Sequence, residues 1–157
     1  MADTSYLDWP FLEPHHRALA LELERWAREN IHDVPHARGQ ETDDACVGLV
    51  RQLGAANWIR YAVGGSSYGG SAETIDTRAI CLIRETLARH SGLADFAFAM
   101  QGLGSGAITL EGSDEQKRDY LPRVAAGTAL AAFALSEPDA GSDVGALRCA
   151  AHPDGSG

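Results

Sequence analysis

Residues 93–110 place the strongest constraint on the fold of this 157-residue chain. They contain one charged side chain, Asp95, and a helix of this sequence would be apolar on every side. Such a helix is stable in water only when other elements surround it. The stretch also holds Gln101, Ser105, Thr109 and three glycines, which argues against a membrane span. We therefore expect a helix buried among other helices.

Four further segments can supply the surrounding helices. Apolar residues recur at three- and four-residue spacing over residues 13–31, and every fourth residue over residues 75–90. Another helix is expected to begin at the potential cap Thr42. Ser113, with a glutamine three residues later, predicts a capping box that opens a polar helix through residue 120. Pro122 is expected to start a separate turn.

The pattern changes at residue 128. Residues 128–135 and 147–151 are short apolar runs separated by a turn-rich segment, and their length favours buried strands. Two short strands do not form a stable sheet without partners. We therefore expect an all-α domain over residues 1–127 and the beginning of a β domain over residues 128–157. The chain would then be part of something longer, or would need another chain to complete it.

Composition excludes several classes of protein. The chain has 13 Lys and Arg against 22 Asp and Glu, a net charge of -9, which argues against a general nucleic-acid binder. The three cysteines are far apart and form no C-x-x-C pair, so neither a zinc ribbon nor a disulfide framework is expected. The first residues lack the basic and apolar regions of a signal peptide. These features together favour a cytoplasmic protein without a membrane span.

Three motifs suggest binding but have simpler explanations. His32 and His36 have the spacing of a zinc-binding helix, but the intervening proline would disrupt that helix. His15 and His16 are adjacent on a helix and would point about 100° apart, so both are expected on the solvated surface. The glycines of residues 102–106 lie inside an apolar helix, where small residues permit close packing. No metal ligands are assigned.

The segment from residue 133 to residue 143 has more specific chemistry. An apolar run ends in a serine and is followed by an acid, a proline and a Gly-Ser-Asp turn. Hydroxyls and closely approaching backbone N–H groups at such a point suit a phosphate or the edge of a flavin. The same residues also make ordinary turns, so the pattern alone leaves both interpretations open.

Residues 134–146, with the sequence ALSEPDAGSDVGA, resemble the signature of the acyl-CoA dehydrogenase family at each specified position. Residues 87–91, 112–118 and 120–124 resemble the stretch that precedes this signature, and residues 68–70 resemble a loop between early helices. The resemblance is therefore collinear from about residue 65 to residue 146.

The resemblance implies a known architecture and reaction. Members have an N-terminal helical domain, a middle β domain and a C-terminal helical domain, and assemble as homotetramers or homodimers. They bind FAD and oxidise the α–β bond of an acyl-CoA in fatty acid metabolism, passing electrons to an electron-transferring flavoprotein. A carboxylate removes the α-proton while the β-hydride passes to flavin N5. The family's catalytic Glu lies in the C-terminal domain, so no catalytic residue is assigned here and this chain alone is expected to be inactive.

Site residues are carried over by position in the signature. Cofactor binding is expected from Phe133, Leu135, Ser136, Gly141 and Ser142. Ser136 occupies the position whose hydroxyl and backbone bond the isoalloxazine edge, and Ser142 the position near both the cofactor phosphate and the pantetheine arm of the substrate. Gly141 would let the backbone come close. The neighbouring acids, Glu137 and Asp143, are expected to make structural hydrogen bonds.

Two alternatives remain open on these residues. The first is another enzyme of the same fold, namely an acyl-CoA oxidase, an acyl-carrier-protein dehydrogenase or a flavin monooxygenase. The second is a short, non-catalytic helical subunit that binds beside a complete flavoenzyme, with the polar helix after Ser113 and the unfinished sheet as docking surfaces.

Overall fold

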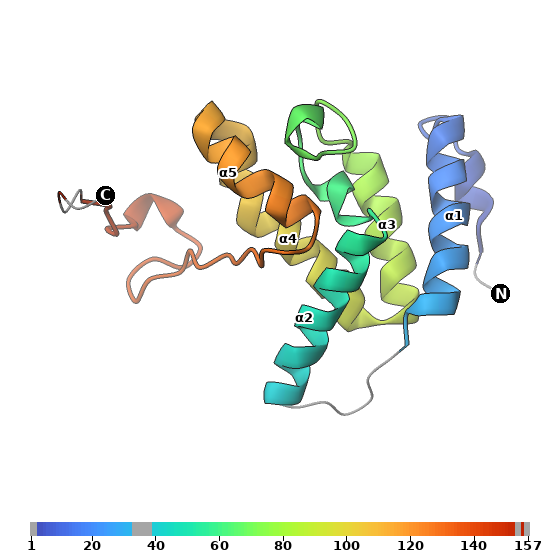
Figure 1. Cartoon of the computed structure of the whole chain (residues 1–157), viewed down its shortest axis with the longest axis horizontal. Coiled ribbons are helices and arrows are strands. Elements are labelled where there is room, and N and C mark those ends of the chain that lie inside the picture. The colour runs from blue at the N-terminus through green and yellow to red at the C-terminus, as the bar shows by residue number, and fades with distance from the viewer. Residues whose placement is uncertain (1–2, 33–38, 153–154, 156–157) are drawn as a thin grey trace.

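The computed structural model describes residues 3–32, 39–152 and 155. Five α-helices make up most of it: α1 (Pro14–Asn30), α2 (Gln40–Ala55), α3 (Thr77–His90), α4 (Gly92–Glu111) and α5 (Asp114–Ala125) (Figure 1). The described residues also form the 3-10 turns η1 (Ser5–Asp8), η2 (Ile59–Ala62), η3 (Ser66–Tyr68) and η4 (Val144–Ala146). Residues 14–125 are called the helical body below, and residues 128–152 the exit segment.

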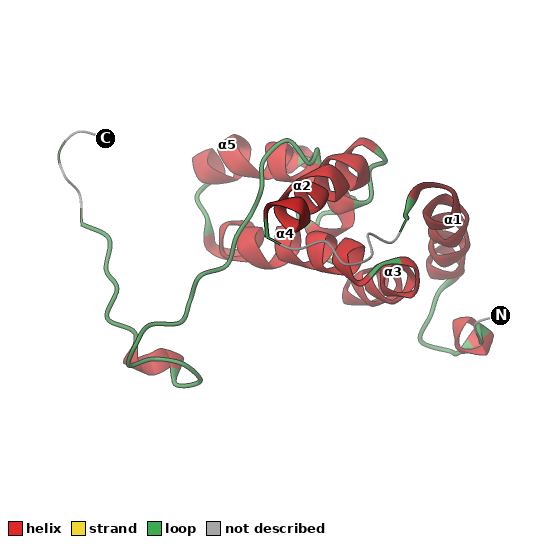
Figure 2. Cartoon of the chain, turned by 90° about the horizontal axis from the view of Figure 1, so that it is seen from below, coloured by secondary structure: helices red, strands yellow, loops and turns green. Residues whose placement is uncertain are grey.

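Helix α4 lies at the centre of the helical body. It packs against α2, α3, α5 and η2, while α1 packs on α3 (Figures 1 and 2). All five α-helices and η2 contribute fully buried side chains to one core, the largest being Leu23, Leu53, Ile59, Ile83, Leu87, Phe98 and Leu121. The predicted mainly helical fold is therefore confirmed, because each periodic segment buries its apolar side against its neighbours.

One side of α4 is left uncovered. Phe96 and Leu103 are more than half exposed, and Leu110 is 72% exposed. The expectation that α4 is surrounded on every side is therefore wrong for the described residues. The neighbouring helices cover only the side that carries Ala94, Ala97 and Phe98. Among the described residues, no helix is long and apolar enough to cross a membrane.

Ser91 joins α3 directly to α4. Its backbone N–H donates to the Leu87 carbonyl at 2.8 Å, which closes α3. Its hydroxyl accepts from the Ala94 N–H at 3.4 Å, which caps the start of α4. One residue therefore satisfies backbone groups at the end of one helix and the start of the next.

The other helix boundaries follow the sequence closely, with two differences. The capping box at Ser113 is confirmed, since its hydroxyl accepts from the Gln116 N–H at 3.2 Å and its own N–H donates to the Gln116 side chain at 2.9 Å. Helix α2 begins two residues before Thr42, with Gly39 as its N-cap. Pro122 lies inside α5 rather than starting a new turn. The buried Leu121 and Val124 hold that turn on the core despite the missing N–H.

The exit segment does not form the strands predicted at residues 128–135 and 147–151. Its backbone leaves the helical body as extended chain, turns, and passes through η4 away from the helices (Figures 1 and 2). The described residues contain one isolated β-bridge, between Glu137 and Ala140. A strand needs a partner for its ladder of hydrogen bonds. No such partner lies beside the exit segment in the described part of the chain.

Candidate functional site

Gln101 of α4 attaches the exit segment to the helical body. Its side-chain oxygen accepts from the Ala131 N–H at 2.8 Å, and its side-chain nitrogen donates to the Ala129 carbonyl at 2.9 Å. The Gln101 side chain is 1% exposed, so these bonds form away from water. Both polar atoms of a buried amide are thereby paired with the backbone that leads into the predicted site.

Gly104, one turn along α4, permits the close approach of the same backbone. A Cβ at this position would lie 2.6 Å from the Ala132 nitrogen and 2.8 Å from its carbonyl oxygen. Gly102 similarly faces Ala62 of η2, where a Cβ would lie 3.1 Å from the Ala62 Cβ. The expectation that the glycines of residues 102–106 permit close packing is confirmed at Gly102 and Gly104 and wrong at Gly106, where a Cβ would meet no atom within 4 Å. The partners are a 3-10 turn and an extended segment.

The five residues predicted to bind the cofactor all lie on the exit segment and are exposed. Phe133 and Leu135 are 48% and 40% exposed, and Ser136, Gly141 and Ser142 also face solvent. Within the described residues, neither serine hydroxyl has a hydrogen-bond partner, nor do the N–H groups of Ser136, Gly141 and Ser142. A Cβ at Gly141 would meet no atom within 4 Å. The segment therefore offers unpaired donors, hydroxyls and apolar side chains to a ligand.

Glu137 holds the turn between these residues in place. Its N–H donates to the Ala140 carbonyl at 2.9 Å, and the Ala140 N–H donates back at 3.1 Å. Its carboxylate accepts from the N–H groups of Arg148 and Cys149 at 2.9 and 2.8 Å. Asp143 accepts from the Gly145 N–H at 3.2 Å. The predicted structural roles of Glu137 and Asp143 are therefore confirmed.

The chemistry of the exit segment fits part of a flavin site. Exposed apolar side chains can lie against a planar ring system, while hydroxyls and backbone N–H groups can bond its polar edge. Residues 128–143 contain no Lys or Arg, so the charge of a phosphate would be balanced elsewhere. The segment can therefore supply only part of the contacts that such a cofactor needs.

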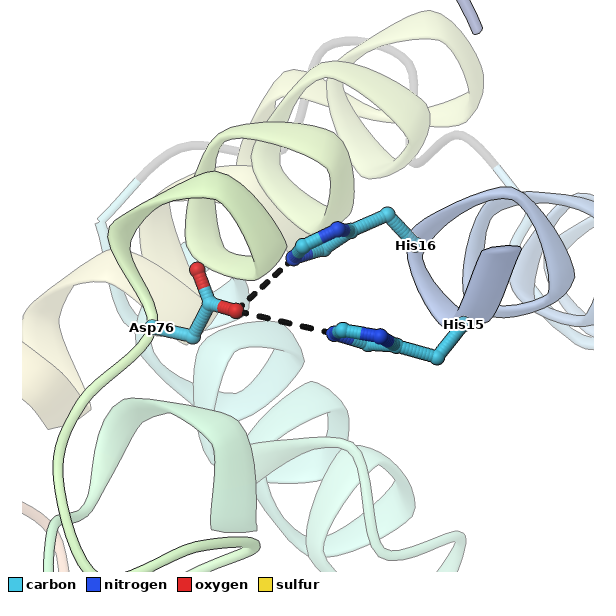
Figure 3. Close-up of side chains that lie close together, drawn as sticks. All are labelled: His15, His16 and Asp76. Atoms are coloured by element: carbon cyan, nitrogen blue, oxygen red, sulfur yellow. Dashed lines mark hydrogen bonds and ion pairs between the residues drawn. The ribbon is translucent and has the colours of Figure 1, made fainter. Parts of the chain in front are cut away.

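A second polar cluster joins α1 to α3 (Figure 3). His15 and His16 point toward Asp76, with their ring centroids 3.9 Å apart. His16 is fully buried, and its Nε2 lies 2.7 Å from the Asp76 carboxylate. The expectation that both histidines are solvated is therefore wrong for His16. The two side chains converge because both face the same carboxylate oxygen of Asp76, the N-cap of α3.

The protons of this cluster favour helix capping over metal binding. The Glu13 N–H donates to Nδ1 of His16 at 3.0 Å, so this nitrogen carries a lone pair and Nε2 carries the proton. A metal ion at Asp76 would need the lone pair on Nε2. The other Asp76 oxygen accepts from the N–H groups of Arg78 and Ala79 and caps α3. The prediction that His32 and His36 do not form a zinc-binding helix stays a prediction, because His36 lies outside the described residues.

The cluster also sets the ionisation of Asp76. Burial alone would raise the pKa of this carboxyl group. The hydrogen bond from His16, together with those from the N–H groups of Arg78 and Ala79, outweighs burial and lowers the pKa to about 2. Asp76 is therefore charged at neutral pH and holds α1 and α3 together.

Sequence reasoning did not single out Gln101 or Asp76. Gln101 could have been found, because an amide inside an apolar helix must be hydrogen-bonded once it is buried. Asp76 lies in the first turn of the helix predicted over residues 75–90, whereas the observed α3 begins one residue after it, at Thr77. An acid at the start of a predicted helix is a preferred cap and could have been singled out. The contact of Asp76 with His16 joins residues 60 positions apart, and no local pattern signals it.

Comparisons with known proteins agree with this architecture. Residues 13–128 match the family model for the acyl-CoA dehydrogenase N-terminal domain. The chain is 41% identical over 88 residues to the probable acyl-CoA dehydrogenase FadE25 of Mycobacterium tuberculosis, covering 56% of this chain and 22% of the relative. It is 54% identical over 55 residues to the rat mitochondrial very long-chain specific acyl-CoA dehydrogenase, covering 35% of this chain and 8% of that protein.

A solved structure matches over a longer part of the chain. The crystal structure of an acyl-CoA dehydrogenase from Bacillus anthracis, complexed with FAD, superimposes with a TM-score of 0.66 and 31% identity. The superposition covers 87% of this chain and 23% of that one. The chain therefore spans less than a quarter of each of these three relatives.

Proposed function

This chain belongs to the acyl-CoA dehydrogenase family, and from that premise we propose that it forms the N-terminal part of an FAD-dependent enzyme that oxidises the α–β bond of an acyl-CoA. Residues 1–127 would form the helical domain and residues 128–157 the start of the β domain. The observation that carries the proposal is the exit segment, whose exposed signature residues leave hydroxyls and backbone N–H groups unpaired within the described residues.

Each site residue has a defined part in this proposal. Phe133 and Leu135 would pack against the flavin ring, and Ser136 would donate to its polar edge. Ser142 would bond the cofactor phosphate or the pantetheine arm of the substrate, with Gly141 leaving the backbone accessible there. Bound FAD supplies the hydride acceptor of the reaction. The residues of this chain bind and orient, and the carboxylate that takes the α-proton lies outside it.

The proposal extends to partners and location. An acyl-CoA is the proposed substrate, an electron-transferring flavoprotein the electron acceptor, and a homodimer or homotetramer the assembly. A cytoplasmic location is part of the same proposal. The exposed apolar residues of α4 support a larger assembled structure, because Phe96, Leu103 and Leu110 recur every seven residues on one face of the helix, and an exposed apolar patch marks an interaction surface.

The first test is a visible absorption spectrum of the complete purified protein that carries this chain, with intact mass measured on the same sample. A flavin band is expected, and its absence would contradict the proposal and favour a non-catalytic binding subunit. Ser142→Ala should then weaken FAD or acyl-CoA binding by about tenfold, as expected for a lost hydrogen bond to a charged group. Ser67→Ala, at an exposed serine of η3, is the matched control.

The identity of the electron acceptor distinguishes the proposed dehydrogenase from an oxidase of the same fold. We expect substrate oxidation to depend on an added electron acceptor. Oxygen consumption with peroxide formation in the presence of acyl-CoA would instead point to an oxidase of the same fold.

A further inference from the structure

We propose that Gln101 is a positioning residue that directs the exit segment, and with it the predicted ligand-binding residues, away from the helical body along one fixed path. The inference rests on the proposed function for the identity of the ligand. The attachment of the exit segment to Gln101 is observed in the structure itself, and none of the binding roles proposed above depends on it.

Gln101 provides the last connection before the predicted site. Earlier in the exit segment, the N–H groups of Thr128 and Ala129 donate to the Arg123 carbonyl at 3.0 and 3.1 Å. Gln101 then binds both Ala129 and Ala131. From residue 132 onward, no described residue of the exit segment makes a hydrogen bond to the helical body. The direction of the chain at Phe133 is therefore set at Gln101.

The bonds to Gln101 are specific to a side-chain amide. One atom accepts from an N–H and the other donates to a carbonyl two residues earlier, so an apolar side chain of similar shape can make neither bond. The Gln101 nitrogen also lies 3.5 Å from the Val124 carbonyl, which fixes the amide against the end of α5. Burial makes each lost partner costly, because water cannot replace it.

Gly104 is an independent part of the same attachment. Ala132 lies so close to α4 that a Cβ at Gly104 would come within 2.6 Å of its backbone nitrogen. Backbone atoms cannot move aside as a flexible side chain can, so the exit segment itself would have to shift. Gly106, two residues further along α4, is open, since a Cβ there would meet no atom within 4 Å.

The test compares Gln101→Met with the wild type in the complete protein. Two readouts are used: hydrogen exchange of the Ala131 amide, and the FAD dissociation constant. Met preserves the length of the side chain but not its polar atoms, so both the exchange rate and the dissociation constant should rise by about tenfold. Gln52→Met is the control, because Gln52 also donates to a backbone carbonyl, that of Asn30 at 2.9 Å, on another side of the body.

Gln101→Glu provides a rescue that a purely structural role would not produce. A buried carboxyl group favours its neutral form, which can donate to the Ala129 carbonyl while accepting from the Ala131 N–H. FAD affinity relative to wild type should therefore be low at pH values where this carboxyl group is ionised and should be regained as the pH is lowered and the group becomes neutral. No regain at the acid end of the range would overturn the inference.

Two further outcomes are decisive. If Gln101→Met does not fold, Gly104→Ala should raise the FAD dissociation constant and the Ala131 exchange rate while Gly106→Ala changes neither, and equal behaviour of the two variants would overturn the inference. If the wild-type protein binds no FAD, the proposed function fails. Exchange at Ala131 then still decides the role of Gln101, and an unchanged rate in Gln101→Met overturns it.

Discussion

The helical body and the exit segment contain similar residues, but the two regions differ in how far these residues are buried and hydrogen-bonded. In the helical body, Phe98 is fully buried, and the starts of α3, α4 and α5 are capped by side chains. In the exit segment, Phe133 is about half exposed, and the serines of the signature have no partner among the described residues. The starts of these helices are therefore satisfied within the body, whereas the exit segment leaves its signature groups exposed.

This contrast explains why the predicted site lies where it does. A backbone group already bonded in a helix cannot bind a ligand, whereas an extended segment leaves its N–H groups available. In the proposed function the helical body holds the exit segment and the exit segment binds the ligand, and the two regions meet at Gln101 and Gly104. Variants that act on one region at positions other than Gln101 and Gly104 should therefore leave the properties of the other region nearly unchanged.

The largest difference in the free energy of unfolding is expected between alanine variants of two phenylalanines, one in each region. Phe98→Ala should lower the free energy of unfolding by about 3–5 kcal/mol, because it opens a cavity in the core. Phe133→Ala should change it by less than about 0.5 kcal/mol, because the side chain is already half exposed. Urea unfolding of both variants provides the measurement. A loss of stability in Phe133→Ala comparable to that in Phe98→Ala would contradict the contrast between the two regions.

Two glycines of α2 test how closely the body is packed. Gly54→Ala should lower the free energy of unfolding by about 2 kcal/mol, because its Cβ would overlap the Ala126 carbonyl and force the backbone apart. Gly48→Ala should raise it by roughly 0.5–1 kcal/mol, because a Cβ there meets nothing and alanine favours the helix. Thermal unfolding shows whether each variant is less or more stable than the wild type. Stabilisation by both variants would show that α2 does not pack closely at residue 54.

Acid should weaken the helical body through Asp76. The pKa of this carboxyl group falls from 3.8 to about 2 on folding, so its contribution is complete above about pH 4 and is lost as the pH falls toward 2. The loss should amount to about 1–2 kcal/mol. Asp76→Asn can still cap α3, so its stability should depend less on pH than that of the wild type.

Urea unfolding at a series of pH values measures this difference. Glu24, whose pKa is also lowered to about 2, is present in both proteins and contributes the same dependence of stability on pH to each. Parallel stability curves for Asp76→Asn and the wild type would refute the role given to Asp76.

The smallest effect is expected at Glu137. Glu137→Gln retains one acceptor oxygen but loses the second, so one of the two N–H groups it holds, of Arg148 or Cys149, should exchange faster. The free energy of unfolding should change by less than about 0.5 kcal/mol, because the segment is exposed. On one sample, hydrogen exchange would measure the faster exchange of the amide, and urea unfolding would measure the change in the free energy of unfolding. A large loss of stability would mean that the exit segment belongs to the cooperative unit of the body.

Local sequence patterns predicted the helical body well. The periodic apolar residues of α1 and α3 and the capping box at Ser113 act over three or four residues, and the structure contains all three features. The structural roles of the turn residues Glu137 and Asp143 were also predicted. The bond that Asp143 accepts comes from the Gly145 N–H two residues along and depends little on distant parts of the chain. The bonds that Glu137 accepts come from Arg148 and Cys149, 11 and 12 residues along, and no local pattern specified these partners.

Features that depend on distant partners were not predictable in this way. An apolar run at residues 128–135 becomes a strand only beside another strand, and the described residues offer none. The burial of His16 depends on Asp76, which reaches it through the packing of α1 on α3. The roles of Phe133, Ser136 and Ser142 toward FAD stay predictions, because a contact with a ligand also depends on a partner that the local sequence does not specify.

The single-residue connection at Ser91 has a consequence for how the chain folds. Because α3 and α4 share this residue, bringing them together requires almost no loop closure. Contacts between sequence neighbours form fastest, since little chain entropy is lost before they are made. We therefore expect the α3–α4 hairpin to form first during folding, before α1, α2 and α5 pack against it.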